Sequence, residues 1–149
     1  MVIVQKASFD TGAEISKLTT GATKIGAIVS FTGLVRDFND GSDVTSLTLE
    51  HYPGMTEKQL QKIENQANER WDLDASLIVH RYGKMELGEP IVLVITASAH
   101  RKDAFEAAEF LMDWLKTKAP FWKLEENTGG TESWVSERSS DLDATKKWT

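Results

Sequence analysis

The sequence contains no cysteine and only three prolines among its 149 residues. The lack of cysteine excludes disulfides, thiolate nucleophiles and cysteine-bound metal ions as features of this chain. Any sulfur chemistry in which the chain takes part must therefore use sulfur that another molecule brings. The scarcity of proline, together with 40% hydrophobic and 27% charged residues, is typical of a globular protein rather than a disordered or fibrous one.

The sequence also lacks a long apolar segment. No run approaches the roughly 18 residues of a membrane-spanning helix, and the opening MVIVQKASFDTGAEI has no long apolar stretch behind a basic start. Basic residues are in the minority as well, since 17 Lys and Arg against 23 Asp and Glu leave a net charge of −6. We therefore expect a cytoplasmic protein with no membrane and no nucleic acid among its partners.

Four segments have the β-branched and alternating composition of strands: residues 25–35, 44–52, 76–83 and 91–99. The last of them is apolar enough to lie in the centre of a sheet. Residues 36–43 are rich in turn formers, so the first two strands are predicted to pair as a hairpin with a long polar tip. Residues 85–90 are predicted to form a turn between the last two strands.

Two segments repeat apolar residues at helical spacing. The first predicts a helix from about residue 55 to 70, with Thr56 and Gln59 at the spacing of a capping box. The second helix is predicted to begin at Arg101 and to end before Pro120, because proline interrupts helical hydrogen bonding. Its buried stripe is expected to comprise Phe105, Ala108, Met112 and Leu115.

The segments FWKLEE and SWVSER flank Asn127 to Gly130, which predicts a second hairpin with FWKLEE as a candidate edge strand. The resulting order β, β, α, β, β, α, β, β indicates an α+β fold with a mixed or antiparallel sheet and two main helices. The length fits a single domain over residues 1–149. The first twenty residues and the tail DLDATKKWT have no clear assignment.

Five basic residues lie where predicted elements end: Arg36, His100, Arg101, Lys116 and Lys123. Element ends are where binding sites are usually built. His100 and Arg101 also open a helix, whose free N–H groups and dipole attract anions such as phosphate. Each of these residues taken alone is more often solvated surface than site, and the three histidines have no metal-ligand spacing. An anion site is therefore one hypothesis among others, and no metal or other cofactor is expected.

Lys116 and Lys123 are more informative as a pair. A helix end and a strand start separate them, so the chain can turn both ammonium groups into one pocket. Two adjacent ammonium groups disfavour each other's charge, which lowers the pKa of at least one and makes it competent as a general base or nucleophile. The other interpretation is that Lys116 only complements the helix dipole. Three nearby aromatic residues are expected to pack in the core: Trp114, Phe121 and Trp122.

Five motifs carry a resemblance to a known family: FTGLVRD (31–37), LTLEHYPGM (47–55), HRYGKMELGE (80–89), SAHRKDAFEA (98–107) and LKTKAPFWKLE (115–125). In this order they resemble the large subunit of molybdopterin synthase, from about residue 25 to the C-terminal tail. The string K-x-x-A-P-F-W-K is unusual, and chance agreement over so many motifs is improbable. The sequence departs from the family at Leu124, where relatives often carry a basic residue, and the first twenty residues match poorly.

The resemblance implies an α/β hammerhead type of fold and a sulfurtransferase of molybdenum cofactor biosynthesis. In that family, sulfur passes from the C-terminal Gly-Gly thiocarboxylate of a small ubiquitin-like subunit to cyclic pyranopterin monophosphate. Two such transfers build the dithiolene of molybdopterin. The large subunit forms a homodimer and binds a small subunit at each end, which gives a heterotetramer.

The resemblance also assigns roles to single residues. It implies that Lys116 and Lys123 are catalytic. It further implies that Arg36, His100 and Arg101 bind substrate or support the pocket. Arg138 matches a family arginine that reaches the neighbouring protomer's site.

Two other classes of protein fit part of the pattern. A non-catalytic α+β module that binds an anionic metabolite would use the same arginines without needing Lys116. A single-strand nucleic-acid binder would stack bases on tryptophan and phenylalanine between lysines, but the net charge of −6 disfavours it.

Overall fold

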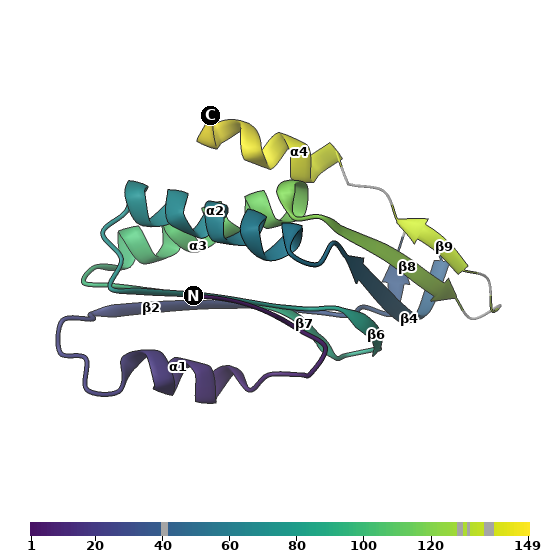
Figure 1. Cartoon of the computed structure of the whole chain (residues 1–149), viewed down its shortest axis with the longest axis horizontal. Coiled ribbons are helices and arrows are strands. Elements are labelled where there is room, and N and C mark those ends of the chain that lie inside the picture. The colour runs from purple at the N-terminus through teal and green to yellow at the C-terminus, as the bar shows by residue number, and fades with distance from the viewer. Residues whose placement is uncertain (40–41, 128–129, 131, 136–138) are drawn as a thin grey trace.

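The computed structural model describes residues 1–39, 42–127, 130, 132–135 and 139–149. In this part of the chain, two sheets meet end to end, and the four α-helices lie about the first of them (Figure 1). The elements are β1 (Val2–Gln5), α1 (Thr11–Thr19), β2 (Ala27–Leu34), β3 (Phe38–Asn39), β4 (Ser42–His51), α2 (Met55–Arg70), β5 (Ala75–Arg81), β6 (Gly83–Glu86), β7 (Pro90–Ser98), α3 (Arg101–Lys118), β8 (Phe121–Asn127), β9 (Glu132–Val135), α4 (Ser139–Thr145) and a final 3-10 turn (Lys146–Trp148). The predicted α+β class is confirmed.

The first sheet has the strand order β1-β5-β7-β2. Strand β7 lies inside it, antiparallel to both β5 and β2, as the apolar run of residues 91–99 predicted. Helices α2 and α3 cover one face of this sheet and α1 covers the other (Figure 1). Because both faces are covered, residues 92–98 are buried without alternation.

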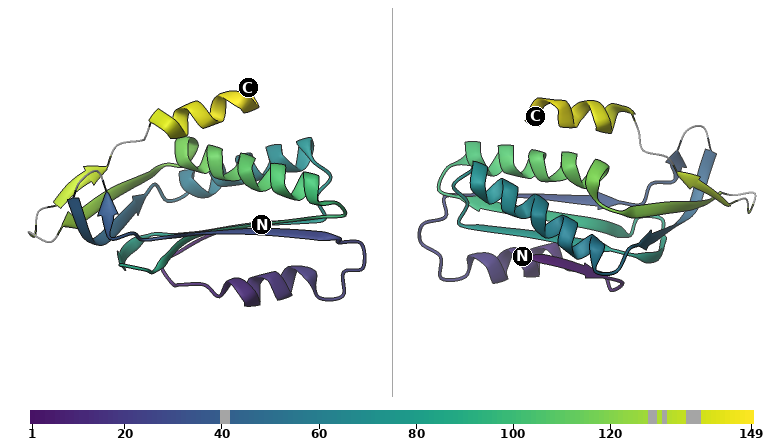
Figure 2. Two further views of the ribbon diagram at one scale, coloured as in Figure 1. Left: turned by 180° about the vertical axis from the view of Figure 1, so that it is seen from behind. Right: turned by 45° about the horizontal axis from the view of Figure 1, so that its top comes forward.

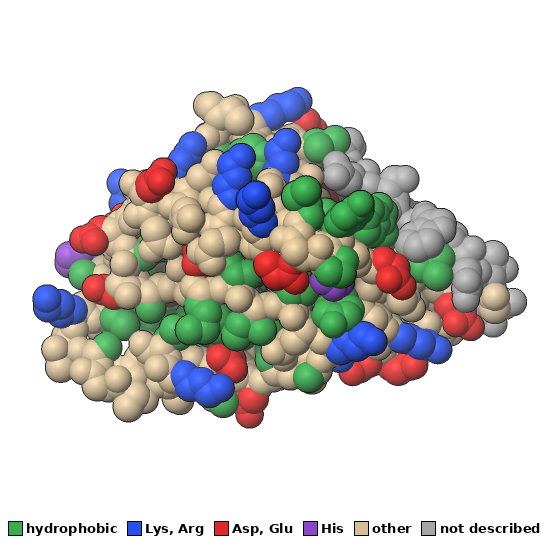
Figure 3. Space-filling model, in the orientation of Figure 1, with side chains coloured by type: hydrophobic (Ala, Val, Ile, Leu, Met, Phe, Trp, Pro, Cys, Tyr) green, Lys and Arg blue, Asp and Glu red, His purple; other side chains and the backbone are tan. Residues whose placement is uncertain are grey.

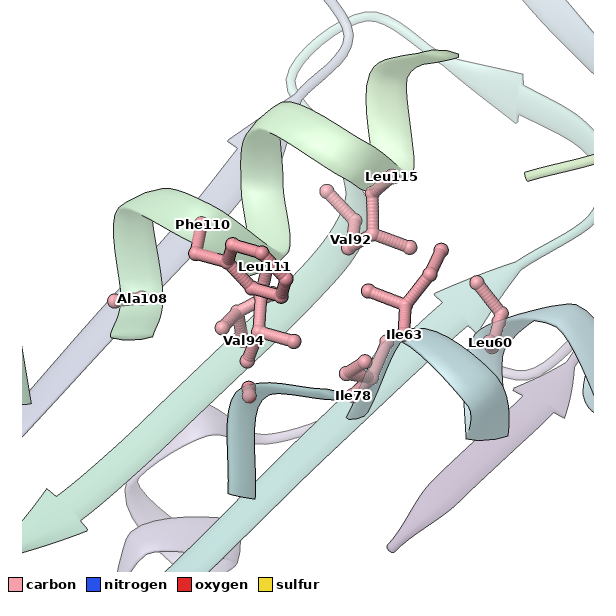
Figure 4. Packing of buried hydrophobic residues seen from close by; sticks show 10 residues of the cluster. Leu60, Ile63, Ile78, Val92, Val94, Ala108, Phe110, Leu111 and Leu115 are labelled. Carbon is pink, nitrogen blue, oxygen red and sulfur yellow. The ribbon is translucent and has the colours of Figure 1, made fainter. Parts of the chain in front are cut away.

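The main core fills the space between the sheet and helices α2 and α3 (Figure 4). Leu60 and Ile63 of α2 face Phe110 and Leu111 of α3 across Ile78 of β5. These side chains are at most 2% exposed, so their burial stabilises the packing of the two helices on the sheet through the hydrophobic effect.

The second sheet has the order β3-β4-β8-β9. Strand β6 also belongs to it and pairs with residues 46–49 of β4. The predicted hairpin of segments 25–35 and 44–52 is therefore wrong, because β2 pairs with β7 whereas β4 pairs with β6 and β8. Strand β2 belongs to the first sheet, and Val35, just beyond its end, packs with β4. Leu47 and Leu49 of β4 pack with Val35 and Met85 in a cluster of their own. Alternating apolar residues predict a strand, but they do not tell which sheet it joins.

The turn predicted over residues 85–90 is also too long. Residues 83–86 form β6, which pairs with β4, and its Met85 is fully buried. Gly83 has a φ of 90°, a left-handed conformation that other residues rarely adopt, and it turns the chain from the first sheet into the second. The second predicted hairpin, by contrast, is confirmed as β8 and β9. FWKLEE is not an edge strand, since β8 lies between β4 and β9.

Helix α2 has the predicted range but a different N-terminal cap. The Gly54 N–H donates to Glu57 Oε2 at 2.6 Å, so Glu57 fills the role that Gln59 was expected to take. Thr56 is buried, and its hydroxyl donates to the Tyr52 carbonyl at 2.8 Å. The threonine therefore closes the preceding turn instead of capping the helix.

Helix α3 also has the predicted range, but its buried stripe is displaced from Phe105, which is 61% exposed. The helix approaches β7 so closely that the Thr96 hydroxyl donates to the Ala104 carbonyl at 2.6 Å. Small residues permit this approach, and the buried face comprises Ala104, Ala107, Ala108, Phe110, Leu111 and Leu115. The prediction placed the larger Phe105 in the buried stripe, but its neighbour Ala104 is the residue that lies against the sheet.

The two ends of the chain, which had no sequence assignment, both form ordered elements. Strand β1 pairs in parallel with β5, and α1 packs Ile15 and Leu18 on the lower face of the sheet. At the other end, α4 and the 3-10 turn lie over α3 on the side away from the sheet (Figure 2). None of the helices in the described residues is long and apolar enough to cross a membrane.

Candidate active site

A cleft of about 570 Å³ lies where the two sheets meet, beside the C-terminal end of α3. The wall from the first sheet contains the end of β2, His80 of β5 and the start of β7. The wall from α3 and the second sheet contains Lys116, Phe121 and Lys123. The first turn of α4 adds a further part of the lining. Segments distant in the sequence therefore meet in one concave surface.

The local sequence explains why two lysines share this cleft. Helix α3 ends at Lys118, since Pro120 cannot donate a helical hydrogen bond, and β8 begins directly at Phe121. Side chains of a strand alternate between its faces, so Phe121 and Lys123 both face the cleft while Trp122 points away and is 47% exposed. Lys116, in the last turn of α3, lines the cleft as well.

Lys123 is the more buried of the two lysines, and its surroundings favour the neutral amine. Burial, the charge of Lys116 and a hydrogen bond with Lys116, in this order of size, lower the pKa of Lys123 from 10.5 to about 8. The carboxylates of Asp141 and Glu125 oppose this effect to a smaller extent. At pH 7, roughly a tenth of Lys123 is therefore neutral and able to accept a proton.

Arg36 follows β2 directly and lines the same cleft. Its guanidinium carries a permanent charge and can form two parallel hydrogen bonds with a phosphate or carboxylate. With the two lysines it gives the cleft a local excess of positive charge in a chain of net charge −6. On the face shown in Figure 3, basic and acidic side chains are interspersed, with no broad basic surface for a nucleic acid.

His80 also lines the cleft, although it did not stand out in the sequence. Its ring stacks on Phe121 with centroids 3.7 Å apart. Its Nδ1 lies 2.9 Å from the Arg81 carbonyl oxygen, which can only accept, so Nδ1 carries the proton. Burial, followed in size by the charges of Lys123 and Lys116, lowers the pKa of His80 to about 4. The ring is thus neutral at physiological pH, and Nε2 is left as a hydrogen-bond acceptor.

The structure does not bring all predicted site residues together. His100 and Arg101 are exposed at the N-terminal end of α3 and do not line the cleft. Fifteen residues separate Arg101 from Lys116, so the helical rise places them about 22 Å apart along α3. Arg138 lies outside the described residues. Of the five predicted site residues that the structure describes, the cleft of one chain contains Arg36, Lys116 and Lys123.

Three groups of the cleft were missed by the sequence analysis: His80, Glu125 and Asp141. Strand alternation from Phe121 gives a signal for Glu125, which shares a face with Lys123. His80 ends an apolar run in phase with the buried Ile78, which indicated an inward position. Asp141 left no such signal, because it reaches the cleft only through the packing of the C-terminal segment on α3.

The burial of Lys123 gives a test that requires no substrate. Because its pKa is lower in the folded chain than its ordinary value of 10.5, the unfolded chain binds more protons between about pH 8 and 10.5. The free energy of unfolding should therefore rise with pH through this range. Lys123→Met should stabilise the fold at pH 7 by on the order of 1 to 3 kcal/mol, allowing for partial solvent screening. This gain should shrink as the pH approaches 10.5.

Denaturant unfolding of the wild type and the variant at several pH values measures the difference. Lys118→Met is the matched control, since Lys118 is a nearby lysine at the end of α3 whose side chain is exposed. If Lys123→Met stabilised the fold equally at pH 7 and pH 10.5, the charge on Lys123 would not destabilise the folded chain, and the prediction would be wrong.

Fold and cleft together define a class of protein: an α+β protein in which a lysine with a lowered pKa, a second lysine and an arginine converge on a site for an anionic ligand. The family model described as "MoaE protein" matches residues 4–118, and the chain belongs to this family. The resemblance to the large subunit of molybdopterin synthase is thereby confirmed.

Individual relatives agree over nearly the whole chain. The molybdopterin synthase catalytic subunit of Pseudomonas aeruginosa is 54% identical over 145 residues, which cover 97% of this chain and 96% of the relative. The structure of a molybdopterin biosynthesis MoaE protein from Burkholderia ambifaria has a TM-score of 0.84 at 46% identity, covering 99% of this chain and 97% of that one. The structure of molybdopterin synthase from Staphylococcus aureus has a TM-score of 0.81 at 32% identity, with coverage of 90% and 96%.

Proposed function

We propose that this chain is the catalytic subunit of a molybdopterin synthase. It transfers sulfur from the C-terminal thiocarboxylate of a small subunit to cyclic pyranopterin monophosphate and thereby forms the dithiolene of molybdopterin. The observation that carries the proposal is the convergence of Lys116 and Lys123 on one cleft, in a chain 54% identical to a catalytic subunit of that enzyme. A lowered lysine pKa also favours an enzyme over a module that only binds an anion.

The two lysines have different surroundings and, in this proposal, different roles. Lys123, partly buried and with a pKa of about 8, exchanges protons as sulfur adds to the substrate and oxygen leaves. Lys116 is exposed at the cleft, where its ammonium group can pair with the anionic thiocarboxylate and with negative charge that develops on oxygen. The chain has no cysteine, so the sulfur must come from another molecule, which in this proposal is the small subunit.

Arg36 is proposed to hold the phosphate of the substrate. Replacing it with alanine should weaken binding of the pterin precursor by on the order of 1.5 to 3 kcal/mol, because alanine cannot replace a charge-assisted hydrogen bond. Calorimetric titration of the precursor into the wild type and Arg36→Ala measures this. Lys24→Ala is a control, since Lys24 is an exposed residue that does not line the cleft. An unchanged affinity for Arg36→Ala would move the phosphate site elsewhere.

His100 and Arg101 are proposed to act in the cleft of a second copy, since they lie about 22 Å from Lys116 in their own chain. The free edge of β2 supports a homodimer. No described strand pairs with that edge, and Ile28, Phe31 and Leu34 on β2 are 41% to 53% exposed. An apolar, unpaired strand edge is a surface to which another chain can add. The edge also borders the cleft, so a second copy there would lie close to Lys116.

The small subunit is proposed to insert its extended Gly-Gly tail into the cleft, and two small subunits with two copies of this chain would form a heterotetramer. The relatives' name, catalytic subunit, supports a partner chain, because it distinguishes one subunit from another. A glycine tail has no side chains and can enter a narrow channel. We further propose that residues 1–149 work as one domain and that the enzyme acts in the cytoplasm.

The direct test is to mix the purified chain with a thiocarboxylated small subunit and the pterin precursor and to measure molybdopterin. Product should form only when all three are present and should be lost when the partner ends in an ordinary carboxylate. Failure of the complete mixture to form product would refute the proposed function. Binding of the precursor without turnover would favour the non-catalytic module instead.

A further inference from the structure

The C-terminal segment, defined here as residues 139–149, connects the cleft with a distant part of the helical layer. Its helix α4 begins above the C-terminal end of α3 and runs back along that helix (Figures 1 and 2). Ser140 and Asp141, in the first turn of α4, line the cleft. The other end of the segment reaches the middle of α3 and the last turn of α2. The segment thus spans the helical layer from the cleft to its far side.

Trp148 fixes the far end of this segment through contacts with both helices. Its indole N–H donates to Asp113 Oδ2 of α3 at 2.7 Å, and its backbone carbonyl accepts from Arg70 Nη2 of α2 at 2.6 Å. Its ring meets those of Trp71 and Phe110 edge to face, with centroids 5.6 and 5.5 Å apart. Both hydrogen bonds involve a charged group, which makes them stronger than neutral ones. Edge-to-face ring contacts add to them.

Helix α4 also packs along α3, where its Thr145 is buried. It has seven residues, too few for a stable isolated helix. Its one large apolar side chain, Leu142, is 46% exposed. The ion pair of Lys146 with Asp143 stays within the segment and does not tie it to the rest of the chain. Lys147 adds one exposed ion pair with Glu109 of α3. Among the described residues, Trp148 is the one that ties the segment to both α2 and α3 through hydrogen bonds and ring contacts.

The segment places the Asp141 carboxylate in the same cleft as Lys123. The Asp141 carboxylate raises the pKa of Lys123, against the larger opposing effects of burial and of Lys116. The other titratable or charged groups that line the cleft come from different elements: Arg36 after β2, His80 of β5, Lys116 of α3 and Glu125 of β8. Of these charges, only that of Asp141 depends on where the C-terminal segment lies.

We propose that Trp148 is a positioning residue for the cleft, because it anchors the C-terminal segment across α2 and α3 and so keeps the Asp141 carboxylate in the cleft that contains Lys123. Trp148 itself does not line the cleft. It acts through Asp141, whose negative charge offsets part of the repulsion between the two lysines. The catalytic meaning of this arrangement rests on the function proposed for Lys123, but the arrangement itself can be tested without turnover.

The test is a double-mutant cycle read by NMR titration of the lysine side chains in the full-length, isotope-labelled chain, with Lys123 assigned through Lys123→Arg. Asp141→Asn should lower the pKa of Lys123 while Trp148 is present, because the substitution removes a negative charge that raises this pKa. In the Trp148→Ala background, the same Asp141→Asn change should leave the pKa of Lys123 unaltered, because the carboxylate has already moved away. The effect of Asp141→Asn is compared between chains with Trp148 and chains with Trp148→Ala. Any change in hydration that Trp148→Ala itself causes therefore cancels.

Hydrogen exchange of the α4 amides provides the second readout. Trp148→Ala should speed exchange in α4 by on the order of tenfold or more, as expected when a charge-assisted hydrogen bond and two ring contacts are lost from a local anchor. Trp148→Phe keeps the ring edges and loses only the N–H donor, so it should have a smaller effect in the same direction. Lys146→Ala is the control, because its ion pair lies within the segment, and it should change neither readout.

The proposal is overturned if Asp141→Asn shifts the pKa of Lys123 equally in both backgrounds or in neither. It is likewise overturned if neither Trp148→Ala nor Trp148→Phe speeds exchange in α4. Neither readout uses the pterin precursor or the small subunit. A failure of the anchor would therefore leave the proposed synthase activity standing, and a failure of that activity would not alter these two measurements.

Discussion

Lys116→Ala is expected to reduce molybdopterin formation by roughly a thousandfold while leaving the fold intact. A positioned proton-transfer or charge-stabilising group contributes about a hundredfold to ten-thousandfold to a rate. Replacing an exposed lysine in a last helical turn, by contrast, costs the fold less than about 0.5 kcal/mol. Initial rates with saturating small subunit and precursor, together with the free energy of unfolding, measure both effects. Lys118→Ala, two residues further along the same turn, should keep its activity.

The charge-retaining variants separate the proposed roles of the two lysines. Arginine carries a charge but does not release its proton near neutral pH. Lys116→Arg should therefore keep part of the activity, because a cation remains to pair with the thiocarboxylate. Lys123→Arg should be as inactive as Lys123→Ala, since neither can exchange a proton. Near wild-type turnover in Lys116→Ala would remove this residue from the mechanism, and an active Lys123→Arg would exclude proton transfer by Lys123.

The position of the lysine pair could be read from the sequence because the deciding interactions are local. Pro120 ends helix α3 within a few residues of Lys116, and strand alternation then puts Phe121 and Lys123 on one face. Both rules act between residues that are close in the sequence. No long-range packing was needed to predict that the two amines approach each other.

The rest of the cleft could not be predicted in this way, because it depends on which distant segments pack together. His80 reaches Lys123 because β5 of one sheet ends where β8 of the other begins. The same limit applies to the fold. Apolar alternation predicted the strands of residues 25–35 and 44–52 correctly, but the same pattern satisfies either sheet. Their wrong pairing followed from the assumption that neighbours in sequence pair in space.

The separation of Arg101 from Lys116 within one chain leads to a second large expected effect, which concerns assembly. Arg101→Ala and Lys116→Ala, each inactive or weak alone, should restore activity when their dimers are dissociated together and allowed to reassemble. If each cleft takes its lysines from one copy and Arg101 from the other, a mixed dimer contains one intact cleft and one with both defects. Random reassembly makes half of the dimers mixed, so about a quarter of the wild-type activity should return.

The matched control pairs Lys116→Ala with Lys123→Ala. Both lysines line the same cleft of a single chain, so every cleft in a mixed dimer of these two variants lacks one of them. This mixture should remain inactive at any ratio. If Arg101 instead served the cleft of its own chain, mixing Arg101→Ala with Lys116→Ala would also leave one defect in every cleft. The absence of recovery there, with dimer exchange verified by mass spectrometry of differently labelled copies, would rule out the shared site. Recovery in the control mixture would show that the two lysines belong to different clefts, contrary to the geometry described above.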